Sequence, residues 1–536
     1  MRLTLLAAAL VASTSAAAQQ RPPKLIVAIS VDQMSSDLWA TYRPHFTGGL
    51  KRLADSGVTF VNGYQAHAAT ETCPGHSTLL TGRWPTATGV VANNWIDQRA
   101  GRADKTIYCA EDERVAGSRS SAYTVSPEHL RASTLGDRLK AATPRSLNVA
   151  VGGKDRSAVM MSGRAADQRW YWDGKDWSTD LKAAPVPRSV AAFRPAFAAR
   201  LAQAQPGLEP PALCQARARD FVVAPNLTVG TGRLARAAGD NRAMRASPEL
   251  DGATLALGAA LTYELGLGRG PATDVLSLGL ASTDYVGHAF GTGGQEMCLQ
   301  MLALDRELGD FLARLDAMKL DYAVVLSADH GALDIPERLR ATGNAAAQRA
   351  DPGLAANEMG KLLGPQVGRS GAVLLGEGIG NDIWLDAAIP ATERPRVLAA
   401  AVARYRGHPQ VAAVFTAAEL ARTPLAVGVS PDRWTLIQRV RASFDPARSG
   451  DFYVVLKEYV SAAAKPSPFY VAGHGTPWDY DRRVPILFSR KGLRAANPAV
   501  AADTADILPT IASWLGLRLA PGSIDGKCRS EAARCR

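Results

Sequence analysis

The sequence predicts an α/β fold, with a mostly parallel central sheet covered by helices on both faces. Three observations predict it: short, nearly continuous apolar runs recur along the chain, helical patterns separate them, and polar residues follow the runs. Apolar runs of this kind are typical of strands buried on both faces of a parallel sheet. Because ligands of such sheets bind beyond the carboxyl ends of the strands, the polar residues lie where a functional site is expected.

The predicted elements follow one another along the whole chain. A helix is expected to begin near Thr72, because Pro74 suits a first helical turn. Further helices are predicted at residues 254–265 and 295–315. Strands are predicted at residues 25–31, 147–151, 275–280 and 323–327, and a shorter β-rich run covers 469–472.

The composition is that of a globular protein, with 47% hydrophobic and 21% charged residues. These proportions exclude a disordered, collagen-like or coiled-coil protein. The formal net charge is +11, but the basic residues are scattered, so we interpret them as a solvated surface and expect no specific nucleic-acid binding. Residues 19–536 are expected to form a single domain, with insertions near 160–250, 335–375 and 420–465.

The first 18 residues have the pattern of a signal peptide. Arg2 is followed by a largely apolar run over residues 3–12 and then by small residues that form an Ala-x-Ala cleavage site. The run is shorter than the roughly 20 residues that span a bilayer, and no later stretch has 18 uninterrupted apolar residues. We therefore expect an exported protein, periplasmic or secreted, without a membrane span.

The six cysteines fit an oxidising compartment, where an even number can pair. Six cysteines allow 15 connectivities, and the sequence alone does not choose among them. Pairing of nearest neighbours would give Cys73–Cys109, Cys214–Cys298 and Cys528–Cys535.

Aspartate and histidine side chains recur near the ends of the predicted strands. An isolated Asp–His pair is more often a helix cap or a salt bridge, but here several occur at equivalent places. Carboxylate and imidazole are ligands of zinc and similar metals, and neighbouring glycines let the backbone turn tightly around an ion. The sequence therefore predicts a metal centre built from Asp32, Asp284, His288, Asp329, His330 and His474.

Thr72 stands at the beginning of a predicted helix. A hydroxyl in this position faces free backbone N–H groups and the positive end of the helix dipole, which favour an alkoxide and a phosphate group. The alternative is that Thr72 only caps the helix.

The chain as a whole resembles the alkaline phosphatase superfamily. More narrowly, it resembles the secreted bacterial alkaline phosphatases with a threonine nucleophile, the PafA and PhoK type, which are related to the type I phosphodiesterases and nucleotide pyrophosphatases. The resemblance is carried, in family order, by Asp32 and by residues 72–76, 93–95, 154–156, 284–288, 329–330 and 473–475.

The resemblance implies two zinc ions and a phospho-threonine intermediate at Thr72. One ion would be held by Asp284, His288 and His474. The other would be held by Asp32, Asp329, His330 and the Thr72 oxygen. A threonine hydroxyl is a poor nucleophile unless it is activated, and metal coordination is one way to activate it.

Three further residues are expected to bind the phosphoryl group. Asn93 resembles the family asparagine, although Asn94 stands beside it. Lys154 and Arg156 lie two apart, so in an extended segment their side chains would point the same way and both could meet phosphoryl oxygens. Without the other motifs, this pair would be interpreted as a solvated turn.

The expected substrates are small phosphate monoesters, because Lys154 and Arg156 compensate the second charge of a dianionic phosphoryl group. The diesterases and nucleotide pyrophosphatases of this superfamily, which resemble the chain in their zinc ligands and nucleophile, generally lack the Lys–Arg pair. Two alternatives are a phosphodiesterase or nucleotide pyrophosphatase, and a non-catalytic exported protein that binds metal or phosphate. We expect a monomer, although the sequence does not fix the oligomeric state. A calcium site would suit acidic turns such as residues 503–506, but no loop pattern identifies one.

Overall fold

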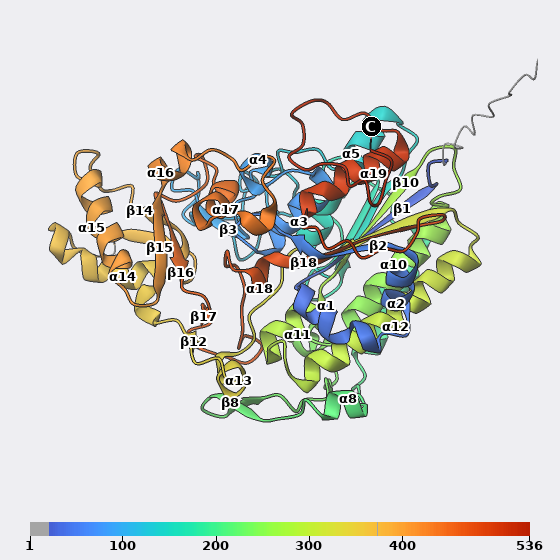
Figure 1. Ribbon diagram of the computed structural model, residues 1–536, viewed down its shortest axis with the longest axis horizontal. Coiled ribbons are helices and arrows are strands. Elements are labelled where there is room, and N and C mark those ends of the chain that lie inside the picture. Colours follow the sequence, from blue (N-terminus) through green and yellow to red (C-terminus); the bar gives the residue numbers. More distant parts are fainter. Residues whose placement is uncertain (1–20, 372, 536) are drawn as a thin grey trace, which may run out of the picture.

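The computed structural model describes residues 21–371 and 373–535 (Figure 1), so the predicted signal peptide lies outside the described residues. Its centre is a nine-stranded sheet in the order β19-β2-β18-β11-β1-β10-β5-β6-β7. From β11 to β6 the neighbouring strands are parallel, whereas β18 is antiparallel to β11 and β2. The predicted mostly parallel sheet is confirmed. Its strands are β1 (Leu25–Val31), β2 (Val58–Tyr64), β5 (Asn148–Gly152), β6 (Gln168–Trp172), β7 (Trp177–Ser178), β10 (Asp274–Leu280), β11 (Tyr322–Ser327), β18 (Arg483–Arg490) and β19 (Ala502–Asp503).

Helices cover both faces of this sheet, and the side chains of β1 alternate between two hydrophobic cores. Leu25, Val27 and Ile29 belong to one core, and Ile26 and Ala28 belong to the other. Because successive side chains of a strand point to opposite faces, an uninterrupted apolar strand needs cover on both sides. The first core includes α1 (Ser36–Tyr42), α2 (Gly49–Ser56), α7 (Arg188–Leu201), α10 (Glu249–Leu265), α11 (Ser282–Phe290) and α12 (Gln295–Ala317); the second includes α3 (Thr72–Thr81), α5 (Leu135–Ala142), α6 (Asp155–Ser162) and α19 (Ile507–Leu515).

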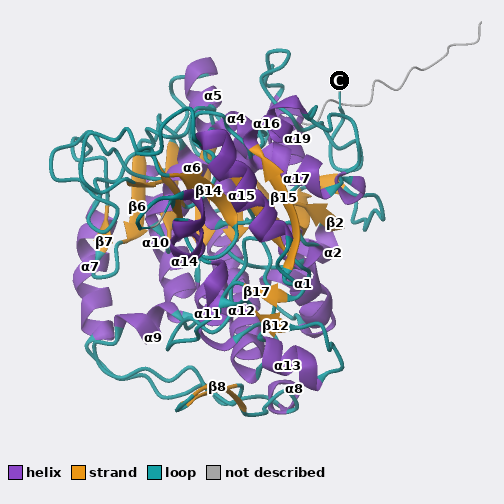
Figure 2. Cartoon of the chain, turned by 90° about the vertical axis from the view of Figure 1, so that its left-hand side faces the viewer, coloured by secondary structure: helices purple, strands orange, loops and turns teal. Residues whose placement is uncertain are grey.

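A second, antiparallel sheet with the order β13-β14-β16-β15 lies to the left of the first in Figure 1 and faces the viewer in Figure 2. One of its faces forms a separate hydrophobic core with two helices, and the other face packs against two more. The strands are β13 (Leu374–Gly376), β14 (Asn381–Leu385), β15 (Val411–Thr416) and β16 (Phe452–Leu456), and the helices are α14 (Ala356–Leu363), α15 (Arg394–Arg406), α16 (Ala417–Arg422) and α17 (Leu436–Ser443).

The remaining elements are short, and they connect or decorate the two sheets. They are α4 (Pro85–Thr88), β3 (Asn94–Ile96), β4 (Thr106–Tyr108), α8 (Ala212–Gln215), β8 (Phe221–Ala224), β9 (Leu227–Val229), α9 (Asn241–Arg245), α13 (Pro336–Ala341), β12 (Gln348–Arg349), β17 (Val460–Ser461) and α18 (Asp479–Arg482). In the described part of the chain, no helix has both the length and the apolar character needed to cross a membrane.

The strands and helices predicted for the main sheet are confirmed to within a few residues, but the strand-like interpretation of residues 469–472 is wrong. Ser467 and Tyr470 exchange backbone hydrogen bonds of 2.9 and 3.0 Å across a turn. Phe469 in that turn has a φ of 66°, which is left-handed rather than extended. The backbone N–H of Val471 then donates to the carbonyl oxygen of His288. The apolar composition of this segment suggested a strand. Its backbone conformation is instead set by the turn and by the hydrogen bond to His288 near the end of α11.

The three disulfides are those given by nearest-neighbour pairing. Cys73–Cys109 joins the first turn of α3 to the segment after β4, Cys214–Cys298 joins α8 to α12, and Cys528–Cys535 closes a loop near the C-terminus. The first of these cross-links holds the helix that begins with Thr72.

A carboxyl group of α12 is buried among three helices. Glu307 lines a cavity of about 330 Å³ whose other walls include Phe193 and Phe197 of α7 and Ala253 of α10. Its Oε2 atom is buried and has no hydrogen-bond partner. Burial, helped by the negative charge of Asp251, raises the pKa of Glu307 to about 9.

We expect Glu307→Gln to stabilise the protein increasingly between about pH 5 and pH 9. The unfolded carboxyl ionises near its ordinary pKa of 4.5, whereas the folded one stays protonated up to about pH 9. The folded state therefore binds more protons in this window, and the wild type loses stability as the pH rises, by up to about 1.4 kcal/mol per pH unit. Urea unfolding of both proteins at several pH values measures the difference. Exposed Glu358→Gln is the control, and parallel pH profiles for wild type and Glu307→Gln would refute the argument.

Candidate active site

Polar residues from separate strands meet at the carboxyl edge of the main sheet. Asp32 directly follows β1, while Asp329 and His330 follow β11 after one intervening residue. Val31 of β1 is paired with Leu280 of β10, and the neighbouring strands β10 and β11 both run parallel to β1. The carboxyl ends of these strands are therefore aligned, and the segments that follow them converge on one place.

The first group of candidate ligands combines helix α11 with a loop. Asp284 and His288 lie one helical turn apart, and His288 Nε2 is 3.2 Å from Asp284 Oδ1. His474 Nε2 is 3.4 Å from the same oxygen. The prediction that Asp284 and His288 stand at a strand end is corrected, because both belong to α11, where a spacing of four residues places them on one face.

The second group consists of Asp32, Asp329 and His330, whose candidate ligand atoms lie within 4.8 Å of one another. His330 Nε2 is 3.4 Å from Asp32 Oδ1 and 3.4 Å from Asp329 Oδ2. The two groups adjoin, because the rings of His330 and His474 stack with their centroids 3.7 Å apart. All six side chains predicted to bind metal are thus brought together.

Backbone carbonyl groups fix the orientation of all three histidine rings. The Nδ1 atom of His288 is 2.8 Å from the carbonyl oxygen of Ala472, and that of His474 is 2.8 Å from the carbonyl oxygen of Thr70. His330 Nδ1 is 2.9 Å from the carbonyl oxygen of Gly331. In a neutral ring, donation from Nδ1 to a carbonyl leaves Nε2 unprotonated, which is the form that binds a metal. In each ring Nε2 faces a carboxylate.

The electrostatics of the cluster fit a bound divalent cation. Burial and the charge of Asp329 raise the pKa of Asp32, and burial lowers the pKa of His330 to about 3, so this imidazole is neutral. Asp32 Oδ1 and His330 Nε2 are buried and have no hydrogen-bond partner. Oxygen and neutral imidazole donors that are buried and unpartnered match the ligand preferences of zinc.

Thr72 is the first residue of α3 and is buried. The N-cap position belongs to Glu71, so Thr72 is not the cap of this helix. Arg156 Nη2 donates to Thr72 Oγ1 over 3.4 Å. A Cβ atom at Gly75 would lie 2.1 Å from the carbonyl oxygen of Asp329, so only glycine allows α3 to approach the carboxylate segment this closely.

Lys154 and Arg156 reach the site from a helix, and the prediction of an extended segment is wrong. Lys154 is the N-cap of α6 and Arg156 lies in its first turn. Lys154 Nζ is 2.7 Å from Asp32 Oδ2 and 2.5 Å from Asp284 Oδ2, so it contacts one carboxylate of each group. Although burial alone would lower the pKa of Lys154, these two carboxylates raise it above its ordinary value, and the ammonium stays charged.

Asn93, rather than Asn94, contacts the helix of Thr72. Asn93 Oδ1 accepts a hydrogen bond of 2.8 Å from the backbone N–H of Cys73, and the backbone N–H of Asn93 donates to Glu71 Oε2 over 2.6 Å. Asn94 instead begins β3, where it pairs with Tyr108. Of the two adjacent asparagines, Asn93 is therefore the one that lies at the start of α3.

Three residues at the site were not predicted from the sequence. His76 Nδ1 lies 2.9 Å from the carbonyl oxygen of Thr72 and 3.0 Å from Asp329 Oδ2. Gln33 Nε2 donates to Asp284 Oδ1 over 3.0 Å, and Glu71 accepts from Asn93 as described above. His76 could have been found, since it is one of only eight histidines and stands in the Thr72 segment. Nothing in the sequence indicated Gln33, because its contact with Asp284 depends on its own backbone φ of 70°.

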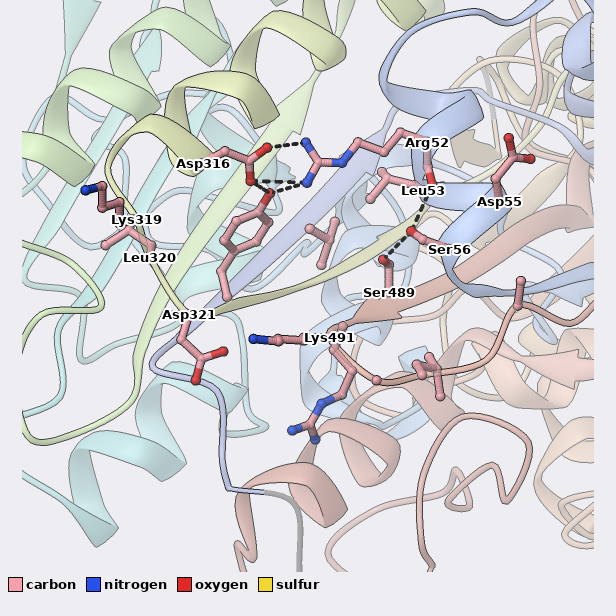
Figure 3. A pocket seen from close by; sticks show the side chains of 16 residues that line it. Arg52, Leu53, Asp55, Ser56, Asp316, Lys319, Leu320, Asp321, Ser489 and Lys491 are labelled. Atoms are coloured by element: carbon pink, nitrogen blue, oxygen red, sulfur yellow. Dashed lines mark hydrogen bonds and ion pairs between the residues drawn. The ribbon is translucent and has the colours of Figure 1, made fainter.

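A surface cavity of about 810 Å³ lies at the opposite end of the strands (Figure 3). Tyr322, at the start of β11, lines it, whereas Asp329 lies beyond the end of the same strand. Arg52 and Asp316 form an ion pair of 2.6 Å on its wall. The cavity is therefore not part of the candidate active site.

Two similar proteins are named alkaline phosphatases. Alkaline phosphatase PhoK of Sphingomonas sp is 50% identical over 511 residues, covering 95% of this chain and 91% of the relative. Alkaline phosphatase PhoD of Zymomonas mobilis is 41% identical and covers 96% of this chain and 89% of its own.

Solved structures share the fold. A crystal structure of alkaline phosphatase PafA has a TM-score of 0.82 and 26% identity, covering 96% of this chain and 100% of its own. Murine ectonucleotide pyrophosphatase / phosphodiesterase 5 has a TM-score of 0.55 at 13% identity, which reflects the fold alone. A sequence model of one family matches residues 26–476, a range that begins in β1 and ends just beyond His474. The chain belongs to the type I phosphodiesterase / nucleotide pyrophosphatase family.

Proposed function

We propose that the protein is a zinc-dependent phosphatase that hydrolyses phosphate monoesters through a phospho-threonine intermediate at Thr72. The observation that carries this proposal is the position of the buried Thr72 hydroxyl, at the N-terminus of α3 and within 3.4 Å of Arg156 Nη2. Two relatives that are 50% and 41% identical are named alkaline phosphatases, which supports the same reaction.

Two zinc ions are proposed to bind the clustered side chains. Asp284, His288 and His474 would hold one ion. Asp32, Asp329, His330 and the Thr72 oxygen would hold the other. When bound, such ions lower the pKa of a hydroxyl group or water and stabilise charge on the leaving oxygen.

The chain's own groups then act on the phosphoryl group as follows. Thr72 Oγ1 attacks phosphorus and loses its proton, the bond from phosphorus to the ester oxygen breaks, and the alcohol leaves with a proton. Water hydrolyses the phospho-threonine and restores the hydroxyl while phosphate departs. The positive end of the α3 dipole favours the anionic phosphoryl group at Thr72 in both steps. Asn93 is held beside the start of α3 by its bond to the backbone N–H of Cys73.

Charge favours a monoester over a diester. A monoester carries a dianionic phosphoryl group, and both Lys154 and Arg156 are cations at the site. A crystal structure of a PafA variant carries substitutions at one threonine, one asparagine, one lysine and one arginine, the same four residue types as in our proposed set. The second candidate function is diester hydrolysis, because the name of the matching family refers to phosphodiesterases and nucleotide pyrophosphatases.

Export is proposed from the signal-peptide pattern of residues 1–18. The three disulfides support it, because disulfides persist in oxidising compartments such as the periplasm. A monomer acting on small phosphate esters remains our proposal for the working form.

The assay that tests the proposed function compares an aryl phosphate monoester with the matching diester. We expect the purified protein to prefer the monoester, to lose activity on chelation and to regain it with zinc, because the six ligand side chains need a cation. Turnover and metal content are measured together. Preference for the diester would select the second candidate, and metal-independent turnover would refute the proposed centre.

Thr72→Ala should lower kcat by at least about a thousandfold, because the covalent route is lost. Rapid acid quenching with a ³²P-labelled monoester should trap phosphate on the wild type and not on the variant. Thr78→Ala, on the same helix, is the matched control and should keep both signals. Labelled phosphoprotein from Thr72→Ala would assign the nucleophile elsewhere.

Arg156→Ala should reduce kcat/KM for the monoester far more than for the diester, roughly a hundredfold against a few-fold, because a second anionic charge is left uncompensated. Arg164→Ala, just beyond the end of the same helix, is the control. The ratio of the two kcat/KM values is the readout. Equal losses on both substrates would contradict the charge argument.

A further inference from the structure

Among its six side chains, the metal-ligand cluster is most open to solvent at His288. Side-chain exposure is 18% for His288 and 8% for His474, but 0% for His330 and 0–2% for the three carboxylates. Thr72 is also buried, at 1% exposure. A substrate whose phosphoryl group reaches Thr72 can therefore extend its organic part past His288.

Two exposed aromatic side chains stand at this opening. Tyr470 stacks on the ring of His288, with centroids 5.1 Å apart and an interplanar angle of 29°. Tyr470 is 44% exposed and the adjacent Phe469 is 36% exposed. Among the described residues, Tyr263 is the only other aromatic side chain with comparable exposure. Two of the three most exposed rings are thus neighbours at the mouth of the site.

The backbone holds this aromatic pair rigidly against the metal ligand. The N–H groups of Val471 and Ala472 both point at the carbonyl oxygen of His288, at 2.6 and 3.3 Å. The His288 ring in turn contacts the carbonyl oxygen of Ala472 through Nδ1. Phe469 keeps a left-handed φ of 66°, a strained conformation for a bulky residue that native structures retain mainly at functional sites.

We propose that Phe469 and Tyr470 form an aromatic platform for flat leaving groups, so that aryl and nucleoside phosphates are preferred over aliphatic ones. The inference rests on the proposed function, because it takes Thr72 as the nucleophile. In-line displacement places the leaving oxygen on the side of phosphorus opposite Thr72, and the most exposed of the six proposed ligands is His288, past which the leaving group can extend. A base or aryl ring that leaves by this route meets the exposed face of Tyr470, and stacking on an aromatic side chain is favourable for any flat ring.

Matched substrates isolate the contribution of the ring. Adenosine 5′-phosphate and the methyl furanoside of ribose 5-phosphate release the same kind of primary alcohol and differ in the base. Phenyl and cyclohexyl phosphate differ in the planarity of the leaving group. We expect Tyr470→Leu to lower the ratio of kcat/KM for adenosine 5′-phosphate over the furanoside about tenfold, as expected for one lost stacking contact.

Three further variants complete the design. Tyr470→Phe retains the ring and should retain the ratio. Phe469→Gly removes the other ring while suiting the left-handed backbone, and should lower the ratio. Tyr263→Leu, an exposed tyrosine of α10 remote from the site, should leave the ratio unchanged.

Dissociation constants measured in the Thr72→Ala background give a readout that does not need turnover. Adding Tyr470→Leu should weaken binding of the flat member of each pair more than the other member, and comparing the two pairs separates nucleoside from aryl recognition. Equal losses within both pairs, or no loss, would overturn the platform. Failure of the proposed function would look different, because the wild type would then hydrolyse none of the four esters while the binding comparison still stood.

Discussion

The structure of the site depends on compensating three buried carboxylates that the sheet brings together. Asp32, Asp284 and Asp329 are each 0–1% exposed. Burying an ionised carboxylate costs several kcal/mol unless cations and hydrogen bonds offset it. Lys154 contacts two of the three, and histidine rings contact all of them. A bound cation would offset the remaining negative charge, which would link metal binding to the stability of the fold.

Helix α3 relates the nucleophile to that charge cluster. Its first turn carries Thr72, and the disulfide to Cys109 fixes the same turn to the segment that follows β4. His76, one turn later, contacts both the Thr72 carbonyl and Asp329. Glu71, just before the helix, positions the backbone of Asn93. Thr72, the proposed nucleophile, is therefore held by contacts that run to the proposed metal ligands on one side and to the proposed phosphoryl-binding residues on the other.

The sequence predicted those features of the site that follow from the local pattern of apolar and polar residues. Apolar runs located the strands, and parallel strands bring Asp32 and Asp329 to one edge whatever the loops do. The parts that were missed depend on backbone conformation. Lys154 and Arg156 reach the site through the first turn of α6 rather than through an extended segment, and Gln33 reaches Asp284 through a positive φ. No periodicity in the sequence encodes either feature.

The segment around His474 explains why a run that looks like a strand became part of the site. Its apolar residues fill no sheet position; Val471 is instead buried against the β8–β9 hairpin, and its N–H bonds to the end of α11. His474 is then oriented by the carbonyl of Thr70, two residues before the nucleophile. This loop thus contacts both α11, which carries His288, and the segment just before α3. Because Tyr470 lies on the same loop, its backbone is tied to the positions of His288 and His474, two proposed metal ligands.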